Sequence, residues 1–333
     1  MTSKPDAPAV ETGMLKPIKA TEVFRKYESM FFFVVLIILN AFITPEFLEW
    51  GTLRNTLVQV FPVMMVALGM TMVISSGGID ISVGSIMAIS GATTARLYVT
   101  GVSSLGLEPV GLAPALACGV AAACMCGFLN GILIAKCKIQ PIIVTLVVMI
   151  AGRGLAQIIL GELSTSLLFT SFADFGSLRI GGVIPVQMLI VVVIVAAMIF
   201  VVKKTNFAKR VEAIGDNRRA ARLVGINTVW VTVGVYTLCG LLCSIAGNME
   251  AARISVVNVG SLGLLVELDA IAAVAIGGTA FSGGKARIMG TVFGAIVVQL
   301  VTIIVNMNNI PDKYSLLFKA VIVIIALWTQ RKK

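Results

Sequence analysis

Long apolar runs alternate with short polar segments along most of this chain. The run from Met188 to Val202 is apolar at every position, whereas a transmembrane barrel strand alternates apolar and polar residues. An α-helix needs about 20 apolar residues to cross a bilayer, and repeated runs near that length cannot all be hidden in one soluble core. The pattern therefore predicts an all-α polytopic membrane protein.

The pattern predicts ten spans, with eight as the alternative count. They cover residues 28–44, 57–76, 81–99, 112–135, 141–160, 183–202, 228–248, 262–280, 288–307 and 314–329. The chain is thereby divided into a cytosolic tail (1–27), one transmembrane domain (28–329) with a cytosolic loop (203–227), and a second cytosolic tail (330–333). Residues 1–26 hold no apolar core, so we expect an uncleaved first span and no signal peptide.

Composition and charge support this division. The 333 residues are 58% hydrophobic and 13% charged, whereas a soluble protein is about 25% charged. With both termini in the cytosol, 19 of the 26 Lys and Arg residues fall in cytosolic segments, as the positive-inside rule requires. Topology thus accounts for the net charge of +10, and no interleaving of aromatic and basic residues suggests nucleic acid.

Candidate catalytic chemistry is sparse. The chain has no histidine, and its six cysteines lack a zinc-binding spacing, so we expect them to be small buried packing residues. The segment Gly278–Lys285 is not a phosphate-binding loop, because an extra glycine precedes the lysine and Ala286 follows it. We therefore expect no cofactor, metal or nucleotide to be bound by this chain.

Two glycine-rich junctions, Ser75–Gly84 and Ile276–Gly284, each separate two apolar runs. They suggest two related halves, since transporter folds often contain internal repeats. Glycines at these places equally suit tight helix contacts or broken helices.

Asp80 lies in the first junction, two residues before Ser82. A carboxylate between apolar spans is costly unless it is paired, capping or hydrated. We favour a cap for the helix that begins at Ile81. A proton or solute site is the alternative.

Arg153 lies between two glycines in the fifth span, where its guanidinium can reach neighbouring carbonyl groups. We favour structural bracing over sugar recognition. Glu267 and Asp269 are two residues apart and do not face each other on a helix. They are candidates to line an extracytoplasmic vestibule, to pair with a basic group such as Arg253, or to cap a helix.

Uncharged polar residues at or within the spans are further candidates for a solute path. A hydroxylated solute needs weak, replaceable hydrogen bonds, although the same side chains also join helices to one another. These residues are Asn130, Gln140, Thr145, Gln157 and Asn306.

The loop 203–227 carries the strongest functional signal. Basic residues at its start suit lipid phosphates, and the small residues after them permit close docking of a helix. Glu212 precedes the arginines, in the order that the helix dipole favours. We expect a helix that docks on a soluble partner, the alternative being a solvated loop that only sets topology. The candidate docking residues are Glu212, Ala213, Gly215, Asp216, Asn217, Ala220, Ala221 and Gly225.

Several motifs, in order, resemble the inner-membrane permeases of bacterial ABC monosaccharide importers, the ribose, galactose and galactofuranose group. They are Gly77–Gly84, Asn130–Ala135 with Ile139–Thr145, Glu212–Asn217 with Ala220–Ile226, and Leu268–Gly278. The stretch Lys138–Pro141 followed by Ala151–Gly154 looks most like the galactofuranose type. Asp216 departs from the pattern, because that position is often a second glycine in this family.

The resemblance implies a multi-pass transport subunit of the bacterial inner (plasma) membrane, and not an enzyme. It implies alternating access driven by cytosolic ATP-binding subunits, which residues 212–225 would contact. A second permease chain, identical or homologous, and a periplasmic or lipid-anchored sugar-binding protein would complete the complex. The alternative from another class is a secondary transporter driven by an ion gradient, with Asp80 or Glu267 as its titrating group.

Overall fold

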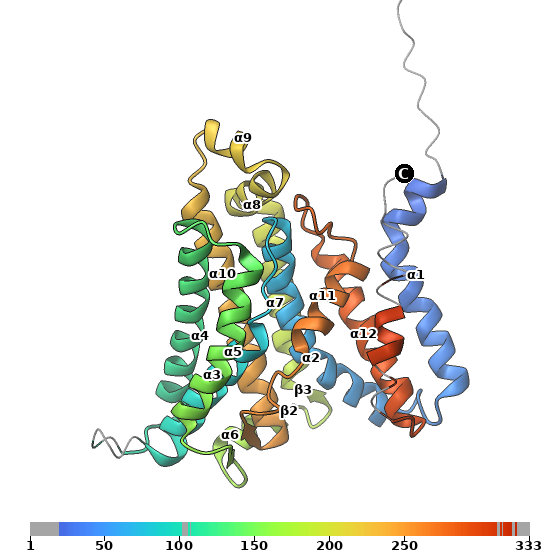
Figure 1. The fold of residues 1–333 in the computed structure, drawn as a ribbon. Coiled ribbons are helices and arrows are strands. Elements are labelled where there is room, and N and C mark those ends of the chain that lie inside the picture. Colours follow the sequence, from blue (N-terminus) through green and yellow to red (C-terminus); the bar gives the residue numbers. More distant parts are fainter. Residues whose placement is uncertain are drawn as a thin grey trace, which may run out of the picture.

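The computed structural model describes residues 20–101, 106, 108–311, 314, 316–321 and 324, with side chains from Met30 onward within these ranges. This part of the chain is mainly helical (Figure 1). Six of its helices are long and apolar enough to cross a membrane. They are α2 (Trp50–Ser75), α4 (Leu112–Ala135), α5 (Pro141–Leu160), α7 (Val186–Lys204), α10 (Thr228–Ile254) and α12 (Ile288–Met307). The predicted spans 112–135, 141–160 and 288–307 coincide with α4, α5 and α12.

Three other predicted spans are occupied by helices whose apolar stretches are shorter. They are α1 (Ala20–Ile43), which is apolar from Met30 onward, α3 (Val83–Ala95) with the π-helical turn η1 (Arg96–Thr100), and α11 (Val266–Ile276). The prediction of a helix throughout 262–280 was wrong, because α11 has only 11 residues. Gly263 and Leu265 take positive φ angles, which a right-handed helix cannot contain. Most of the predicted span 314–329, and the tail 330–333, lie outside the described residues.

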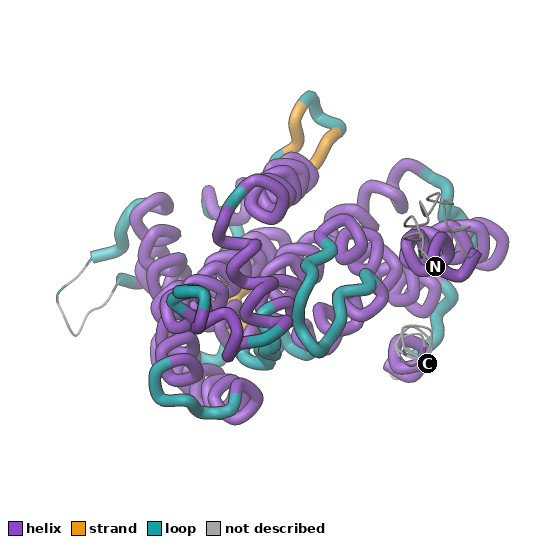
Figure 2. The backbone as a smooth tube through the Cα atoms, turned by 90° about the horizontal axis from the view of Figure 1, so that it is seen from above, coloured by secondary structure: helices purple, strands orange, loops and turns teal. Residues whose placement is uncertain are grey.

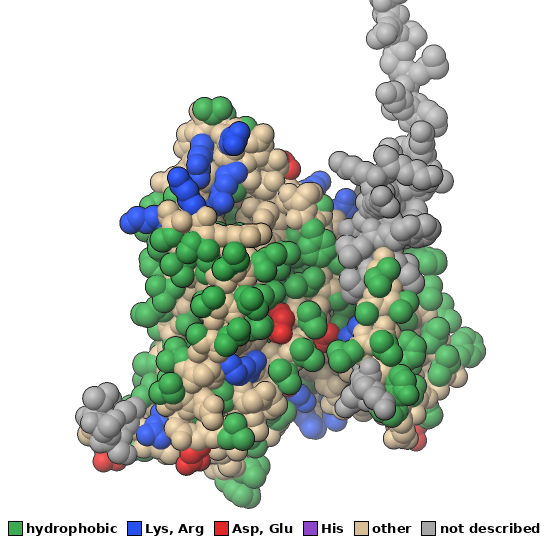
Figure 3. All heavy atoms as spheres, in the orientation of Figure 1, with side chains coloured by type: hydrophobic (Ala, Val, Ile, Leu, Met, Phe, Trp, Pro, Cys, Tyr) green, Lys and Arg blue, Asp and Glu red, His purple; other side chains and the backbone are tan. Residues whose placement is uncertain are grey.

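The polar elements gather at opposite ends of the bundle (Figure 1). One end carries α8 (Asn206–Asp216) and α9 (Arg218–Leu223). The other carries α6 (Ser171–Ser177), the hairpin β2 (Arg179–Ile180) and β3 (Ile184–Pro185), and an antiparallel pairing of β1 (Ser164–Ser166) with β4 (Val256–Asn258). Figure 2 looks along the bundle and shows the only described strand hairpin projecting from one side. Between the two ends, apolar side chains form a belt across the face shown in Figure 3.

The centre of the bundle is built from α2 and α10, which are buried along much of their length. Glycines bring α10 against α4: a Cβ on Gly131 would lie 2.5 Å from Val233 Cα, and one on Gly240 would lie 2.5 Å from Ala123 O. Inside a bilayer the hydrophobic effect does not bring helices together, and close packing of small residues drives their association instead.

The cysteines only partly follow the expectation of burial. Cys239 and Cys243 are fully buried in α10, but Cys118 and Cys137 are exposed, which corrects the prediction for these two. Hydrophobicity alone does not distinguish a residue that faces the protein core from one that faces lipid. The described residues contain no group of metal-ligating side chains.

Candidate coupling surface and solute path

The helix α8 is seated on both glycine-rich junctions. Gly215 lies against the backbone of Ser75 and Gly284, and a Cβ at Gly215 would overlap Ser75 O. The carboxylate of Glu212 accepts a hydrogen bond from the N–H of Ala286 at 2.9 Å. Gly283 and Gly284 have φ angles of +93° and +98°, a region that favours glycine. The smallness of Gly215 is therefore used within this chain, to fit α8 between the two junctions.

The junctions also contact each other. Gly284 N donates to Ser75 O at 2.9 Å. Nearby, the hydroxyls of Thr71 in α2 and Thr291 in α12 lie 2.7 Å apart. The carboxylate of Asp216 would meet a Cβ built on Gly284. Asp216, at the position where the family often has glycine, thus sits beside a glycine of the second junction.

Two arginines tie α9 to the start of α10. Arg218 Nη2 donates to Thr232 Oγ1 at 2.7 Å, and Arg222 Nε donates to Thr228 Oγ1 at 3.0 Å. Asn217 caps α9 by accepting the N–H groups of Arg219 and Ala220, both at 3.0 Å. Burial, and then the charge of Arg222, lower the pKa of Arg218. A guanidinium nevertheless stays charged at neutral pH, so these bonds keep their charge assistance.

The exposed tip of α9 was missed by the sequence analysis. Leu223 is 88% exposed and Val224 is 76% exposed. Ala220 and Gly225 are exposed beside them, whereas Ala221 is buried and Ala213 half-buried. The sequence signal that could have revealed this tip is a pair of adjacent apolar residues, Leu223 and Val224, in an otherwise basic loop. We call Leu223 and Val224 the α9 tip.

Asp80, Ser82 and Asn130 form one buried cluster. Asp80 Oδ1 accepts the backbone N–H of Ser82 at 2.9 Å and its hydroxyl at 2.6 Å, and Ser82 Oγ accepts from Asn130 Nδ2 at 2.9 Å. Asp80 therefore stabilises the turn before α3, but the prediction that it is an N-cap was wrong, because α3 begins at Val83 and its N-cap residue is Ser82. Thr145 adjoins this cluster, with its hydroxyl 3.0 Å from Pro141 O and 3.5 Å from Ile79 O.

Arg153 braces the backbone that precedes α11. Its Nη1 donates to Val259 O at 2.8 Å and to Leu262 O at 2.6 Å. Carbonyl groups in this non-helical segment need such donors, because no helix satisfies them. Glu267, in the first turn of α11, is half-buried and interacts electrostatically with Arg153.

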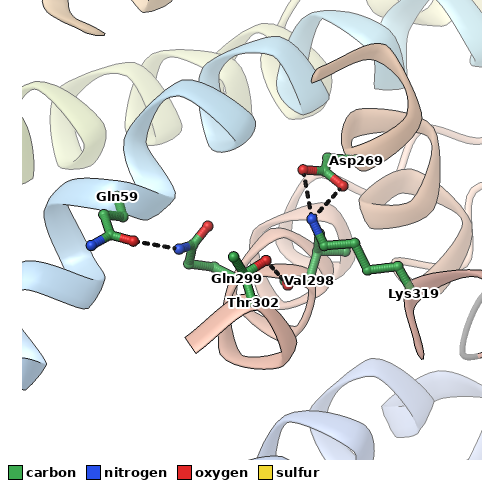
Figure 4. Close-up of polar contacts among 6 residues, drawn as sticks. All are labelled: Gln59, Asp269, Val298, Gln299, Thr302 and Lys319. Carbon is green, nitrogen blue, oxygen red and sulfur yellow. Dashed lines mark hydrogen bonds and ion pairs between the residues drawn. The ribbon is translucent and has the colours of Figure 1, made fainter. Parts of the chain in front are cut away.

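Asp269 forms an ion pair with Lys319, whose Nζ lies 2.8 Å from Oδ1 and 3.0 Å from Oδ2 (Figure 4). The suggested pairing of Glu267 or Asp269 with Arg253 is wrong. Arg253 Nη2 instead lies 2.7 Å from Glu250 Oε1 in the same helix, α10. Two segments that are 50 residues apart in sequence meet at the contact of Asp269 with Lys319.

The remaining candidates do not form one path. Gln140 and Gln157 are exposed at different places on α5, Gln140 being its N-cap residue. Asn306 lies at the other end of α12 from the second junction, beside a cavity of about 150 Å³. Its lining residues are Thr52, Asn55, Thr56, Gln59, Ile303, Asn306 and Met307. Gln59 accepts a hydrogen bond from Gln299 at 3.0 Å, which joins α2 to α12 (Figure 4).

Known proteins resemble this chain over nearly its full length. The ribose import permease protein RbsC of Escherichia coli (strain K12) is 36% identical over 92% of this chain and 94% of its own length. RbsC of Bacillus subtilis (strain 168) is 37% identical over 96% of both chains. The galactofuranose transporter permease protein YtfT of Escherichia coli (strain K12) is 35% identical over 90% of this chain and 88% of its own. No solved structure matches it significantly.

A family model described as "branched-chain amino acid transport system / permease component" matches residues 52–327. This range includes both glycine-rich junctions and the segment that joins them, α8 with α9. The protein is therefore a multi-pass membrane protein and belongs to the family of these permease components.

Proposed function

We propose that this chain is the permease subunit of an ATP-driven ABC importer that carries a monosaccharide across the inner membrane into the cytoplasm. The names of its relatives support the class of solute: ribose and galactofuranose, and fructose at 33% and 30% identity.

In this proposal the end that carries α8 and α9 lies in the cytosol, with both termini, and the chain crosses the membrane ten times. The gathering of Lys and Arg at that end supports the orientation (Figure 3). The opposite end, with α6 and the β2–β3 hairpin, would then receive solute from an extracytoplasmic sugar-binding protein.

ATP hydrolysis belongs, in this proposal, to separate cytosolic subunits that dock on the α9 tip, and the chain itself binds no nucleotide or other cofactor. Leu223 and Val224 offer the apolar centre of a docking surface, and the arginines around them offer a charged rim. The bonds from Arg218 and Arg222 to α10 make α9 stiff enough to transmit a displacement. A second permease chain completes the pore.

One contact carries the mechanism: α8 touches both junctions at Gly215. A movement imposed on α9 and α8 by the ATP-binding subunits therefore reaches the C-terminal end of α2 and the loop before α12 together. Rocking of these two groups of helices would open the path first to one side and then to the other.

The test is the double substitution Leu223→Asp and Val224→Asp in the intact complex, with copurification of the ATP-binding subunits and ATP-dependent uptake as readouts. We expect a folded permease that loses both. The matched control is Phe169→Asp, which changes a fully exposed residue in the segment between β1 and α6 and should retain the ATP-binding subunits. Normal retention and uptake in the double variant would refute docking at the α9 tip.

A further inference from the structure

The backbone immediately before α11 makes a strained corner. Leu265, the N-cap residue of α11, has φ +61° and ψ +7°, a left-handed conformation that costs a residue with a Cβ about 1–2 kcal/mol. Bulky apolar residues are rarely found there, and glycine would adopt it freely. Leu264 and Leu265 are nevertheless 58% and 39% exposed. Two leucine side chains are therefore exposed at a position where the backbone is strained.

The base of this corner is held firmly. Arg153 binds the carbonyl groups of Val259 and Leu262, and the Leu262 side chain is buried. Gly263 packs on Gly84 of α3, where a Cβ on Gly263 would lie 2.8 Å from Gly84 O. The exposure of Leu264 and Leu265 is thus a fixed feature of a braced segment, and strain of this kind is characteristic of functional positions.

Lipid is an unsuitable neighbour for this corner. In Figure 1, α11 begins at about half the height of the bundle, and Figure 3 shows charged side chains inside the apolar belt at that height. Non-helical backbone at membrane depth is tolerated only against protein or a water-filled cavity. Arg153 and Glu267, both only half-buried, flank the corner and impose the same requirement.

We propose that Leu264 and Leu265 form the apolar gate of the solute path, closing against the same residues of a second copy of this chain. This proposal rests on the proposed function, which supplies the path. A two-fold axis brings identical patches together, and a patch that carries both Arg153 and Glu267 offers each copy the charge opposite to its own. Leu268, which is 52% exposed one turn into α11, extends the same surface. A narrow apolar constriction excludes water and small polar solutes until it opens.

Cross-linking between copies tests the contact. In a chain whose six cysteines are replaced, Leu264→Cys should form a disulfide-linked dimer when membranes of the intact complex are oxidised. Trapping the ATP-binding subunits with ATP and vanadate should change its yield. The matched control is Val192→Cys, which is 63% exposed on α7 and should give no dimer. Equal yields at the two positions would refute the gate.

Leakage tests the gating role separately. Leu264→Ala with Leu265→Gly removes both side chains while relieving the strain at residue 265, so the fold should be retained. We expect ribose or fructose to equilibrate severalfold faster across proteoliposomes without ATP than with the unchanged complex. Unchanged leakage, together with normal ATP-driven uptake, would refute the gate while leaving the importer intact. Absence of ATP-driven uptake in the unchanged complex would instead refute the proposed function.

Discussion

The N–H of Gly284 donates a hydrogen bond to the carbonyl oxygen of Ser75 across 2.9 Å. This bond joins two glycine-rich junctions from opposite halves of the chain, and Gly215 of α8 is pressed against both of its residues. Three segments that are remote in sequence therefore form one backbone-to-backbone contact at the end of the bundle where the basic loop lies. Little room exists there for any side chain.

Gly215→Ala should displace α8 from the junctions, because its Cβ would overlap Ser75 O. Overpacking of this kind costs about 1–3 kcal/mol, and we expect a lower melting temperature in detergent together with reduced ATP-dependent uptake. The control is Gly154→Ala in α5, where a Cβ meets nothing within 4 Å and alanine favours the helix. If Gly215→Ala left the melting temperature and uptake unchanged, the contact of Gly215 with Ser75 and Gly284 would not be close-packed.

Cysteine labelling should reveal which end of the bundle faces the cytosol. In cells that produce the permease without its ATP-binding subunits, and in a background without the six native cysteines, a membrane-impermeant maleimide applied to intact cells should label Phe169→Cys and not Leu223→Cys. Both positions are highly exposed, so access to the reagent depends on the side of the membrane. After permeabilisation both should react. Labelling of Leu223→Cys in intact cells would invert the proposed orientation.

Asp80→Asn should preserve most ATP-driven uptake, because an amide oxygen can accept the Ser82 N–H as the carboxylate does. Asp80→Leu removes this acceptor and should destabilise the turn by about 0.5–2 kcal/mol. Proteoliposomes of the whole complex, with ATP and the proton and sodium gradients varied independently, provide the measurement. Uptake driven by a gradient without ATP, and lost in Asp80→Asn, would favour the secondary transporter.

The pair of Asp269 and Lys319 should show strong coupling. Lys319→Met leaves the partly buried carboxylate without its cation and should cost on the order of 3 kcal/mol. Asp269→Asn combined with Lys319→Met should recover much of that loss, because no unpaired charge remains. Thermal unfolding of the four proteins in detergent measures the coupling. A loss in the double variant equal to the sum of the losses in Asp269→Asn and Lys319→Met would mean that the pair contributes nothing.

Hydropathy predicted the long spans well because crossing a bilayer demands continuous apolar sequence. It overestimated the eighth span because the segment before Val266 is just as apolar as α11, and φ angles such as that of Leu265 leave no mark on hydropathy. The hydrogen bonds of Asp80 are local, since they reach only to Ser82, but the sequence placed the start of the helix two residues too early and so made Asp80 its N-cap.

Contacts between remote segments were beyond the reach of pattern analysis. Lys319 is no more obvious a partner for Asp269 than Arg253 is, and only the packing of the helices distinguishes them. The smallness of Gly215 was interpreted as a sign of docking on a soluble partner. The sequence did not reveal that its immediate partners, Ser75 and Gly284, belong to the same chain.

The link between Asp269 and Lys319 also has a consequence for biogenesis. The carboxylate is synthesised 50 residues before its cation, and α11 is too short to cross the bilayer as an independent segment. The carboxylate therefore lacks its cation until residue 319 has been synthesised, and an unpaired carboxylate inside a bilayer is costly. We expect α11 to reach its final position only after the segment that carries Lys319 has been inserted.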